Sequence, residues 1–249
     1  MVDVPIALQL YTIRELTALD LRGALQKVAA LGYEGVEIAG TGGRSADDMK
    51  GLLDSCSLRP AGNHVGLDQL ETDIEAVADY NLSLGSPYVV VPYLADDRRT
   101  SAADWQRVAA SLTEAAERLQ PHGLKLAYHN HSFEFARFDG RAGLDILYSQ
   151  APADKVYAEV DTYWVQHGGR DPAEFIASMP GRCPLIHLKD MAAGEGQEFC
   201  EVGHGILDWE RIFRACEVGG AEWYIVEQDS CPADPLESAR KSIDWLRSR

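Results

Sequence analysis

The sequence predicts an α/β fold of the (β/α)8 TIM-barrel type, with eight parallel strands surrounded by helices. Three observations lead to this prediction. Short apolar, β-branched runs alternate with longer amphipathic runs from Ile6 to Trp245. The apolar runs number eight, the number of strands that closes such a barrel. The length of 249 residues suits one barrel, so we expect residues 1–249 to form a single domain.

Each expected strand is an apolar run bounded by turn-forming residues. In chain order the runs are residues 6–10, 35–38, 59–63, 88–91, 125–128, 156–160, 185–188 and 223–226. Longer amphipathic runs separate them, so each strand is expected to connect to the next one through a helix. This repetition is typical of a parallel sheet.

The expected helices have recognisable first and last residues. Four capping residues precede amphipathic runs. They are Asp20 before 21–31, Ser45 before 46–56, Ser101 before 102–119 and Asp208 before 209–218. Gly32, Gly123 and Gly219 are expected to end helices in the left-handed conformation, which Gly adopts at little cost. Pro172 and Pro235 are expected at first helical positions.

A doubly wound open sheet is the competing architecture. It usually carries a Gly-rich phosphate-binding loop directly after its first strand. Here the first strand leads into Tyr11-Thr12-Ile13-Arg14, and the Gly203-His204-Gly205 string lies beyond the seventh strand. The sequence therefore favours the barrel and argues against a dinucleotide site.

Composition and charge narrow the classes of partner. The chain is 46% hydrophobic and 25% charged, which is typical of a globular protein with a substantial core. Its formal net charge of −16 repels polyanions, and no run approaches the roughly 20 apolar residues of a membrane span. We therefore expect neither nucleic acid nor a membrane as a partner. Five cysteines without a Cys-x-x-Cys pair indicate a reducing compartment, so we expect a cytoplasmic protein, and a homo-oligomer is left open.

The candidate chemistry lies at the carboxyl ends of the last four strands, because barrel active sites are built there. Each of these ends carries imidazole or carboxylate groups. The motifs are Tyr128-His129-Asn130-His131 followed by Glu134, then Glu159-Val160-Asp161, His187-Leu188-Lys189 and Glu227-Gln228-Asp229. Alternate residues of a strand share a face, so three pairs are expected to point inward. They are His129 with His131, Glu159 with Asp161, and His187 with Lys189.

Nitrogen and oxygen donors from His, Asp and Glu are typical ligands of divalent metals. Burying several unpaired ionisable groups would cost several kcal/mol each, and a dication offsets their repulsion. The sequence therefore predicts one divalent metal ion at the barrel mouth. The imidazoles favour a transition metal over calcium, and Mn, Co, Fe, Zn and Mg stay open.

The first four strands end in hydrogen-bonding groups with fewer charges. They are Gln9, Tyr11, Arg14, Glu37, Asn63, His64 and Tyr93. A wall of donors and acceptors opposite a metal suits a hydroxyl-rich ligand, because each buried polar group needs a partner. Tyr11, Tyr93 and Trp164 offer aromatic faces to a sugar ring. We therefore expect a small, sugar-like substrate.

These motifs resemble the xylose-isomerase-like TIM-barrel superfamily, and within it the sugar phosphate isomerase/epimerase family. The matching stretches span nearly the whole chain. They are residues 8–14, 128–131 with 133–135, 159–164, 187–190, 201–205 and 224–229. The resemblance implies a divalent metal held by residues from strands five to eight. It also implies proton transfer beside a carbonyl that the metal polarises.

Three metal ligands carry over from the resemblance, namely Asp161, His187 and Glu227. The fourth departs from the pattern, because many relatives read Glu-Asn-His where this chain begins the same motif with His129. The resemblance thus places an imidazole at a ligand position that a carboxylate usually occupies. In epimerase relatives two Glu ligands exchange the proton. Here Glu227 would fill one of these roles and His129 or Glu134 the other, which favours a single-base or elimination mechanism.

Glu159 lies two residues before Asp161 and one layer deeper in the barrel. It is expected to orient His129 or His187, to replace the missing carboxylate as a ligand, or to form a salt bridge in the core. These three roles stay open.

The remaining candidates are expected to contact the substrate. Lys189 would meet a substrate oxygen, or pair with Asp190 or Asp161 instead. The resemblance places His64 at the substrate, and His131 faces the same mouth. A phosphate group is not expected, because the mouth is acidic and shows no Gly-rich anion site.

The leading functional expectation is a metal-dependent isomerase or epimerase of a ketose or related keto-sugar. A dehydratase or lyase that acts on a keto-sugar after the same proton abstraction is the nearest alternative, because of His129. A sugar-binding barrel without catalysis is the third. Repair endonucleases share this barrel, but they need more metal ligands and a basic DNA track, which this sequence lacks.

Overall fold

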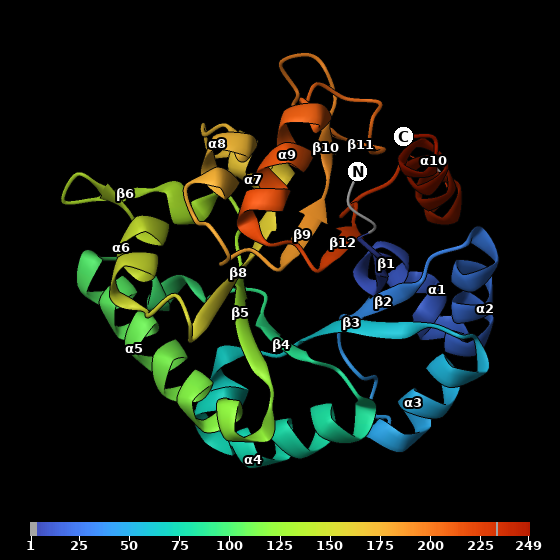
Figure 1. The fold of residues 1–249 in the computed structure, drawn as a ribbon, viewed down its shortest axis with the longest axis horizontal. Coiled ribbons are helices and arrows are strands. Elements are labelled where there is room, and N and C mark those ends of the chain that lie inside the picture. The colour runs from blue at the N-terminus through green and yellow to red at the C-terminus, as the bar shows by residue number, and fades with distance from the viewer. Residues whose placement is uncertain (1–3, 233) are drawn as a thin grey trace.

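The computed structural model describes residues 4–232 and 234–249, and its main sheet is a closed parallel barrel (Figure 1). Around the barrel the strands follow the order β1 (Ile6–Gln9), β12 (Trp223–Val226), β9 (Leu185–Leu188), β8 (Val156–Asp161), β5 (Lys125–His129), β4 (Tyr88–Val91), β3 (Arg59–His64) and β2 (Gly35–Ile38). β1 pairs with both β12 and β2, which closes the ring. The predicted (β/α)8 barrel is confirmed.

Helices surround the strands (Figure 1). They are α1 (Arg14–Leu19), α2 (Leu21–Leu31), α3 (Ala46–Ser55), α4 (Leu67–Leu84), α5 (Ala102–Leu119), α6 (Gly143–Gln150), α7 (Thr162–His167), α8 (Pro172–Ala177), α9 (Trp209–Gly219) and α10 (Pro235–Arg247). Short 3-10 turns cover Leu10–Ile13 (η1), Asp96–Arg98 (η2), Gln120–His122 (η3) and Phe133–Phe135 (η4). Two small hairpins pair β6 (Arg137–Phe138) with β7 (Arg141–Ala142), and β10 (Asp190–Met191) with β11 (Phe199–Cys200).

The predicted helix starts are confirmed by side-chain caps. The four predicted capping residues each accept a hydrogen bond from a backbone N–H in the first turn. One predicted helix end is wrong, because Gly219 still belongs to α9 and Gly220 takes the left-handed conformation (φ 79°). A Cβ at Gly219 would lie 2.8 Å from Ile176 Cγ2, so close packing is the reason for a glycine there. Gly123 is left-handed as predicted, but it follows η3 rather than α5 directly.

Three strands run one residue further than their apolar patterns. β3, β5 and β8 end at His64, His129 and Asp161. His129 pairs in register with Glu159, and Asp161 with His187, so the parallel ladder continues into the polar residues. The strand ends thus hold these side chains on rigid backbone.

The interior of the barrel is divided into an apolar layer and a polar layer. The apolar layer consists of Ala7, Ala61, Tyr88, Val90, Ala127, Leu185, Trp223 and Ile225. Side chains alternate along a strand, so residues two positions later point into the same interior, one layer nearer the C-terminal mouth. Gln9, His129, His187 and Glu227 occupy these positions. The apolar layer thus supports the polar one from below.

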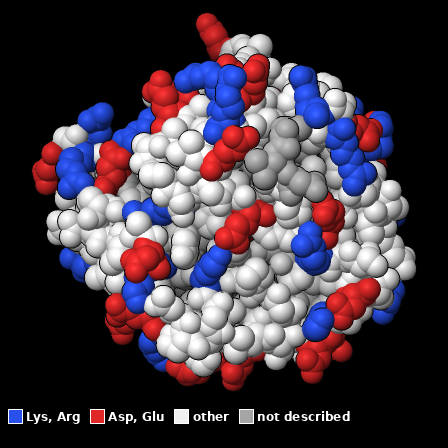
Figure 2. All heavy atoms as spheres, in the orientation of Figure 1, with Lys and Arg blue, Asp and Glu red and all other residues white. Residues whose placement is uncertain are grey.

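The outer surface and the helices bear on possible partners. On the face drawn in Figure 2, Lys and Arg side chains lie scattered among Asp and Glu and form no continuous track. Within residues 4–232 and 234–249, no helix is both long and apolar enough to span a membrane.

Candidate metal centre and substrate cavity

A cavity of about 520 Å³ opens at the carboxyl ends of the strands. It is lined by Tyr11, Ala39, Gly40, His64, Pro92, Tyr93, His129, His131, Glu227 and Asp229. Tyr11 and Tyr93 are 44% and 50% exposed, so they stand at its rim. The volume lies in the range of small-molecule sites, which agrees with the expected position of a site in a barrel.

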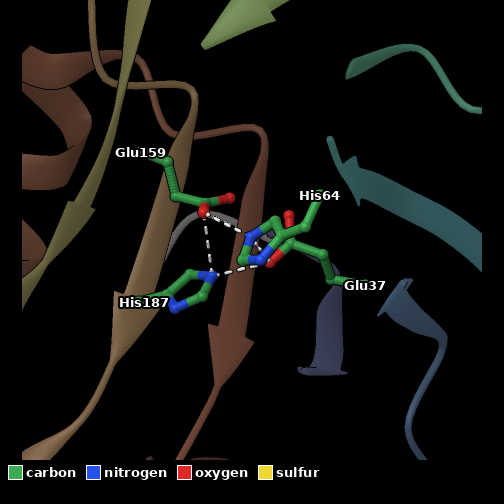
Figure 3. A group of neighbouring side chains, drawn as sticks. All are labelled: Glu37, His64, Glu159 and His187. Atoms are coloured by element: carbon green, nitrogen blue, oxygen red, sulfur yellow. Dashed lines mark hydrogen bonds and ion pairs between the residues drawn. The ribbon is translucent and has the colours of Figure 1, made fainter. Parts of the chain in front are cut away.

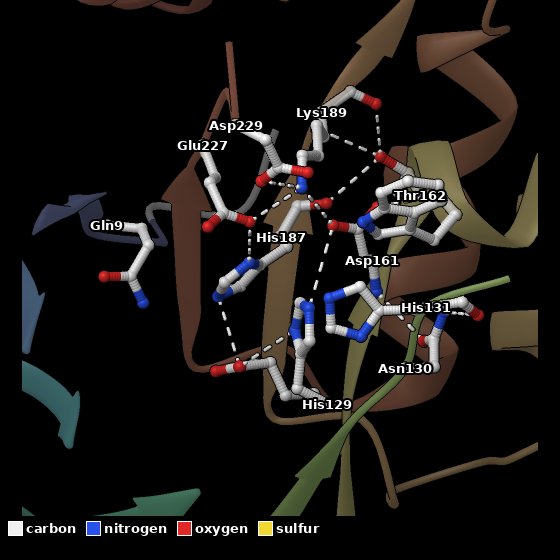
Figure 4. A network of polar contacts seen from close by, with 12 residues as sticks. Gln9, His129, Asn130, His131, Asp161, Thr162, His187, Lys189, Glu227 and Asp229 are labelled. Carbon is white, nitrogen blue, oxygen red and sulfur yellow. Dashed lines mark hydrogen bonds and ion pairs between the residues drawn. The ribbon is translucent and has the colours of Figure 1, made fainter. Parts of the chain in front are cut away.

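The four residues predicted as metal ligands lie together beside this cavity, and two of them, His129 and Glu227, line it (Figure 4). They are His129, Asp161, His187 and Glu227, and we call them the upper cluster. One ligand atom from each lies within 4.8 Å of the others, and all four side chains are buried. Each comes from the end of a different strand, so closure of the barrel is what brings them together.

Local hydrogen bonds hold the upper cluster in place. His187 Nδ1 lies 3.0 Å from Glu227 Oε2. Asp161 is held at both ends: its backbone N–H donates to Asn130 Oδ1 (3.1 Å), and its carboxylate accepts from the Trp164 N–H (2.8 Å) in the first turn of α7. The carboxylate therefore caps α7 and faces the cluster.

Lys189 supplies a buried ammonium beside two of these carboxylates. Its Nζ lies 3.2 Å from Asp161 Oδ2, 2.9 Å from Glu227 Oε2 and 2.7 Å from Asp229 Oδ1. Of the two partners predicted for Lys189, Asp161 is confirmed and Asp190 is wrong. Asp190 instead accepts hydrogen bonds from four backbone N–H groups and from the Trp209 indole.

The charges around Lys189 fit a divalent cation. Three carboxylates meet one ammonium, which leaves two negative charges when the imidazoles are neutral. Burial raises the pKa of Asp161 to about 7, although Lys189 opposes this shift. Burial and neighbouring positive groups lower the pKa of His129 well below its usual range, so its imidazole is neutral and has a free lone pair. The residues of the upper cluster therefore suit a metal.

A second set of side chains lies deeper in the barrel and touches the first (Figure 3). Glu159 Oε2 lies 3.1 Å from His129 Nδ1, 3.2 Å from His187 Nε2 and 3.0 Å from His64 Nε2. Glu37 Oε2 lies 2.7 Å from His187 Nε2. Glu159 thus contacts both histidines that it was expected to orient.

Three other predicted site residues lie around the cavity. His131 lines it, and burial lowers the pKa of this imidazole to about 4. Trp164 packs against the His131 ring, with centroids 5.5 Å apart, but is not among the residues that line the cavity. Glu134 also lies outside the lining, because it accepts hydrogen bonds from Tyr128 Oη and the His131 N–H, both at 2.9 Å.

Two members of the predicted polar wall belong elsewhere. Asn63 donates to Asn81 Oδ1 on α4 (3.1 Å). The next residue of the same strand, His64, points into the cavity instead. Arg14 donates to the carbonyls of Tyr11 and Asp229 and so joins two loops. Neither residue lines the cavity.

Two residues matter more than the sequence suggested. Glu37 was expected only as one member of a polar wall, yet it contacts His64 and His187 directly. Asp190 fixes the loop that contains Gly203 and Gly205, where a Cβ on Gly205 would overlap the Asp190 carboxylate. Strand alternation places Glu37 inward beside Gln9, which was the available signal. The local sequence carries no comparable signal for Asp190.

Comparison with known proteins places the chain in a family. The model of the xylose isomerase-like TIM barrel family matches residues 25–249. The inosose dehydratase of Lacticaseibacillus casei is 24% identical over 90% of this chain and 87% of its own length. A crystal structure named sugar phosphate isomerase/epimerase, from Parabacteroides distasonis ATCC 8503, superposes with a TM-score of 0.86 at 23% identity, over 100% of this chain and 95% of the other.

A zinc-bound structure also shares the fold. The IOLI protein with a bound zinc atom superposes with a TM-score of 0.76 at 16% identity, over 98% of this chain and 97% of that protein. At these identities the structural matches establish the fold, whereas the family model covers most of the chain. The protein belongs to the xylose isomerase-like TIM barrel family.

Proposed function

We propose that this protein is a metal-dependent dehydratase that removes water from a small polyhydroxylated ketone of the keto-inositol or keto-sugar type. The observation that carries the proposal is the upper cluster, two imidazoles and two carboxylates beside a sugar-sized cavity that His129 and Glu227 line. The name of the Lacticaseibacillus casei relative favours dehydration over isomerisation. The zinc atom in the IOLI structure supports a metal-dependent reaction.

The upper cluster would hold the metal through its two imidazole nitrogens and two carboxylate oxygens. A bound divalent ion would polarise the ketone and acidify the adjacent C–H bond. Side chains of the protein would carry out the remaining steps. Lys189 holds Asp161 and Glu227 in position through ion pairs, and its own charge is stabilised by the same carboxylates.

Glu227 would take the proton from the carbon beside the carbonyl. Its carboxylate lines the cavity and stays ionised, because Lys189 and His187 overcome the effect of burial and hold its pKa well below the usual range. The C–H bond breaks, and its electron pair forms a C=C bond to the next carbon of the substrate. The C–O bond of the hydroxyl on that next carbon breaks at the same time. The departing hydroxide recovers the proton from Glu227 and leaves as water. One group then serves as base and acid, which fits a site with His129 in the second carboxylate position.

His131 would bind a substrate hydroxyl. It lines the cavity and is neutral at physiological pH, because burial and the charge of Lys189 lower its pKa to about 4. Its Nδ1 has no hydrogen-bond partner among the described residues. An unpaired buried nitrogen beside the cavity is suited to accept a hydrogen bond from a polyhydroxylated ligand.

The test is Glu227→Gln. The matched control is Glu222→Gln, an exposed carboxylate that pairs with Lys125 at the opposite end of the barrel. With Mn²⁺ and inosose in deuterated water, we expect Glu227→Gln to lower the rate of unsaturated ketone formation by about 10²-fold or more. Glu222→Gln should retain the wild-type rate. Ultraviolet absorbance of the conjugated ketone measures the product.

Two results would contradict the proposal. A Glu227→Gln variant with wild-type activity would remove Glu227 from the chemistry. Wild-type enzyme that returns deuterium-labelled isomers of a keto-sugar without any unsaturated product would instead favour an isomerase or epimerase. Mass spectrometry of the recovered sugars distinguishes these outcomes.

A further inference from the structure

A second group of four ligand-capable side chains lies directly against the upper cluster. Glu37, His64, Glu159 and His187, which we call the lower cluster, come from β2, β3, β8 and β9 (Figure 3). One ligand atom from each lies within 4.8 Å of the others. Glu37, Glu159 and His187 are fully buried, whereas the side chain of His64 is 12% exposed and lines the cavity. The lower cluster is therefore reachable from the cavity.

The facing atoms of the lower cluster alternate between nitrogen and oxygen. His64 Nε2 lies 3.0 Å from both Glu37 Oε2 and Glu159 Oε2. His187 Nε2 lies 2.7 Å from the Glu37 oxygen and 3.2 Å from the Glu159 oxygen. A tetrahedral zinc site with bonds of about 2.0–2.1 Å holds its ligand atoms roughly 3.3 Å apart. The lower cluster needs only a small outward movement to reach that spacing.

Several buried atoms of this region lack partners. Within the described part of the chain, Glu37 Oε1, Glu159 Oε1 and His129 Nδ1 make no hydrogen bond. His129 Nδ1 lies 3.1 Å from Glu159 Oε2, yet without hydrogen-bond geometry. Fully buried polar atoms almost always have a partner, because burial without one costs free energy. A cation bound among these atoms would give them the partner that they lack.

His187 connects the two clusters through its two ring nitrogens. Nδ1 faces Glu227 of the upper cluster, and Nε2 faces Glu37 and Glu159 of the lower one. A neutral imidazole that ligates a metal through Nδ1 keeps a single proton, on Nε2. One ring nitrogen of His187 thus faces each cluster, which places this side chain between the two groups of carboxylates.

The two clusters together are rich in carboxylates. Five carboxylates surround a single lysine ammonium. The carboxylates are Glu37, Glu159, Asp161, Glu227 and Asp229, and the ammonium belongs to Lys189. Such an excess of carboxylates suits the binding of more than one dication.

The backbone is shaped around Glu37. The register of β2 with β3 shifts between Val36 and Glu37, so that Glu37 pairs with Gly62. A Cβ on Gly62 would overlap Glu37 Oε1, so the glycine leaves room for the carboxylate. Gln9 Nε2 donates to Glu37 Oε2 at 2.7 Å and fixes its orientation. The lower cluster is thus supported by its own bulge, glycine and hydrogen bond.

We propose that Glu37, His64 and Glu159 bind a second divalent transition-metal ion at the inner end of the cavity, with His187 between the two ions. The inference rests on the proposed metal-dependent function. The donor set of one imidazole and two carboxylates suits Zn²⁺, Mn²⁺ or Co²⁺. The second ion would bind another oxygen of the substrate on the side where His64 lines the cavity.

The experiment counts ions in the whole protein. Chelator-treated protein is titrated with Mn²⁺ by calorimetry, and bound metal is measured by elemental analysis after gel filtration. We expect two equivalents in the wild type, and one in each of Glu37→Gln and Glu159→Gln. Asp161→Asn should also bind one equivalent, now in the lower cluster. Two Mn²⁺ ions this close should couple magnetically, so each single-site variant should show the spectrum of an isolated ion in electron paramagnetic resonance.

The control is Glu134→Gln, a buried carboxylate outside both clusters, and it should keep two equivalents. Circular dichroism shows whether each variant is folded, and His64→Asn supplies a third, smaller change in the lower cluster. One equivalent in the wild type that persists in Glu159→Gln would overturn the second site and leave the proposed function intact. No bound metal in the wild type would overturn both.

Discussion

Two lysine–carboxylate groups stand at opposite ends of the barrel. At the N-terminal end, Lys125 Nζ lies 2.8 Å from Glu222 Oε1, and the two side chains are 39% and 51% exposed. At the C-terminal end, Lys189 is 1% exposed and contacts three carboxylates, of which Asp161 and Glu227 belong to the upper cluster. The chemical groups are the same, and burial differs.

The difference decides what each group contributes. An exposed ion pair is screened by water and typically contributes about 0–1 kcal/mol to the free energy of unfolding. A buried pair costs desolvation that its attraction only partly repays, and removing one partner leaves an uncompensated charge. Buried and strongly interacting charges often mark functional sites. We therefore expect the C-terminal group to serve the proposed function, and the N-terminal group to be a surface feature of the barrel.

The largest effect is expected for Lys189→Met, with Lys125→Met as its matched control. In metal-free protein, Lys189→Met should lower the free energy of unfolding by about 3–5 kcal/mol, because the carboxylates lose their ammonium. Lys125→Met should cost about 0–1 kcal/mol. Urea denaturation in the presence of a chelator measures both. Saturating Mn²⁺ should reduce the loss in Lys189→Met, since the dication then neutralises the same carboxylates.

The same two variants are expected to differ in catalytic activity. Lys189→Met should lower kcat/KM for dehydration by about 10²-fold, because Lys189 holds Glu227 ionised and in position. Lys125→Met should leave it unchanged. Equal losses in the two variants, in stability or in activity, would contradict the contrast between the two ends.

The barrel could be predicted from local patterns because each strand and helix carries its own signal. Strands β2, β4, β9 and β12 have the predicted bounds, since their apolar runs and flanking turns coincide. Strands β5 and β8 each run one residue further than predicted, because His129 and Asp161 are polar and end the apolar pattern. Their strand conformation comes from pairing with neighbours that local sequence does not reveal.

The site could be predicted only in part. The upper cluster follows from strand ends and alternation, which are local rules. The contact between Glu37 and His187 joins residues 150 positions apart, so it depends on how the barrel closes. The role of Asp190 likewise depends on a loop that folds back over it. Sequence patterns show which residues point inward, and the partner of each one is a property of the whole barrel.

Glu134 provides a buried carboxylate whose hydrogen bonds come from neutral groups, in contrast to those beside Lys189. Burial raises its pKa to about 8 from an ordinary value of 4.5. The folded protein therefore keeps a proton that the unfolded chain loses between about pH 4.5 and 8, so this residue makes stability fall as pH rises through that window. Glu134→Gln should remove this part of the pH dependence.

Urea denaturation of both proteins at pH 5 and pH 8 tests this prediction. Relative to the wild type, Glu134→Gln should be more stable at pH 8 than at pH 5, by an amount on the order of 1 kcal/mol or more. A difference between the two proteins that is the same at both pH values would show that Glu134 does not hold the proton.

The smallest effect is expected for Glu222→Gln at the N-terminal end. The amide keeps an oxygen that can accept the hydrogen bond of Tyr88 Oη, now 2.7 Å from Glu222 Oε2, and loses only the attraction to Lys125. We expect a change in the free energy of unfolding of about 0–1 kcal/mol at low ionic strength, and a smaller one in 1 M NaCl, where the Debye length is about 3 Å. Thermal unfolding at both salt concentrations measures it. A loss as large as that of Lys189→Met would mean that exposure does not separate the two lysine groups.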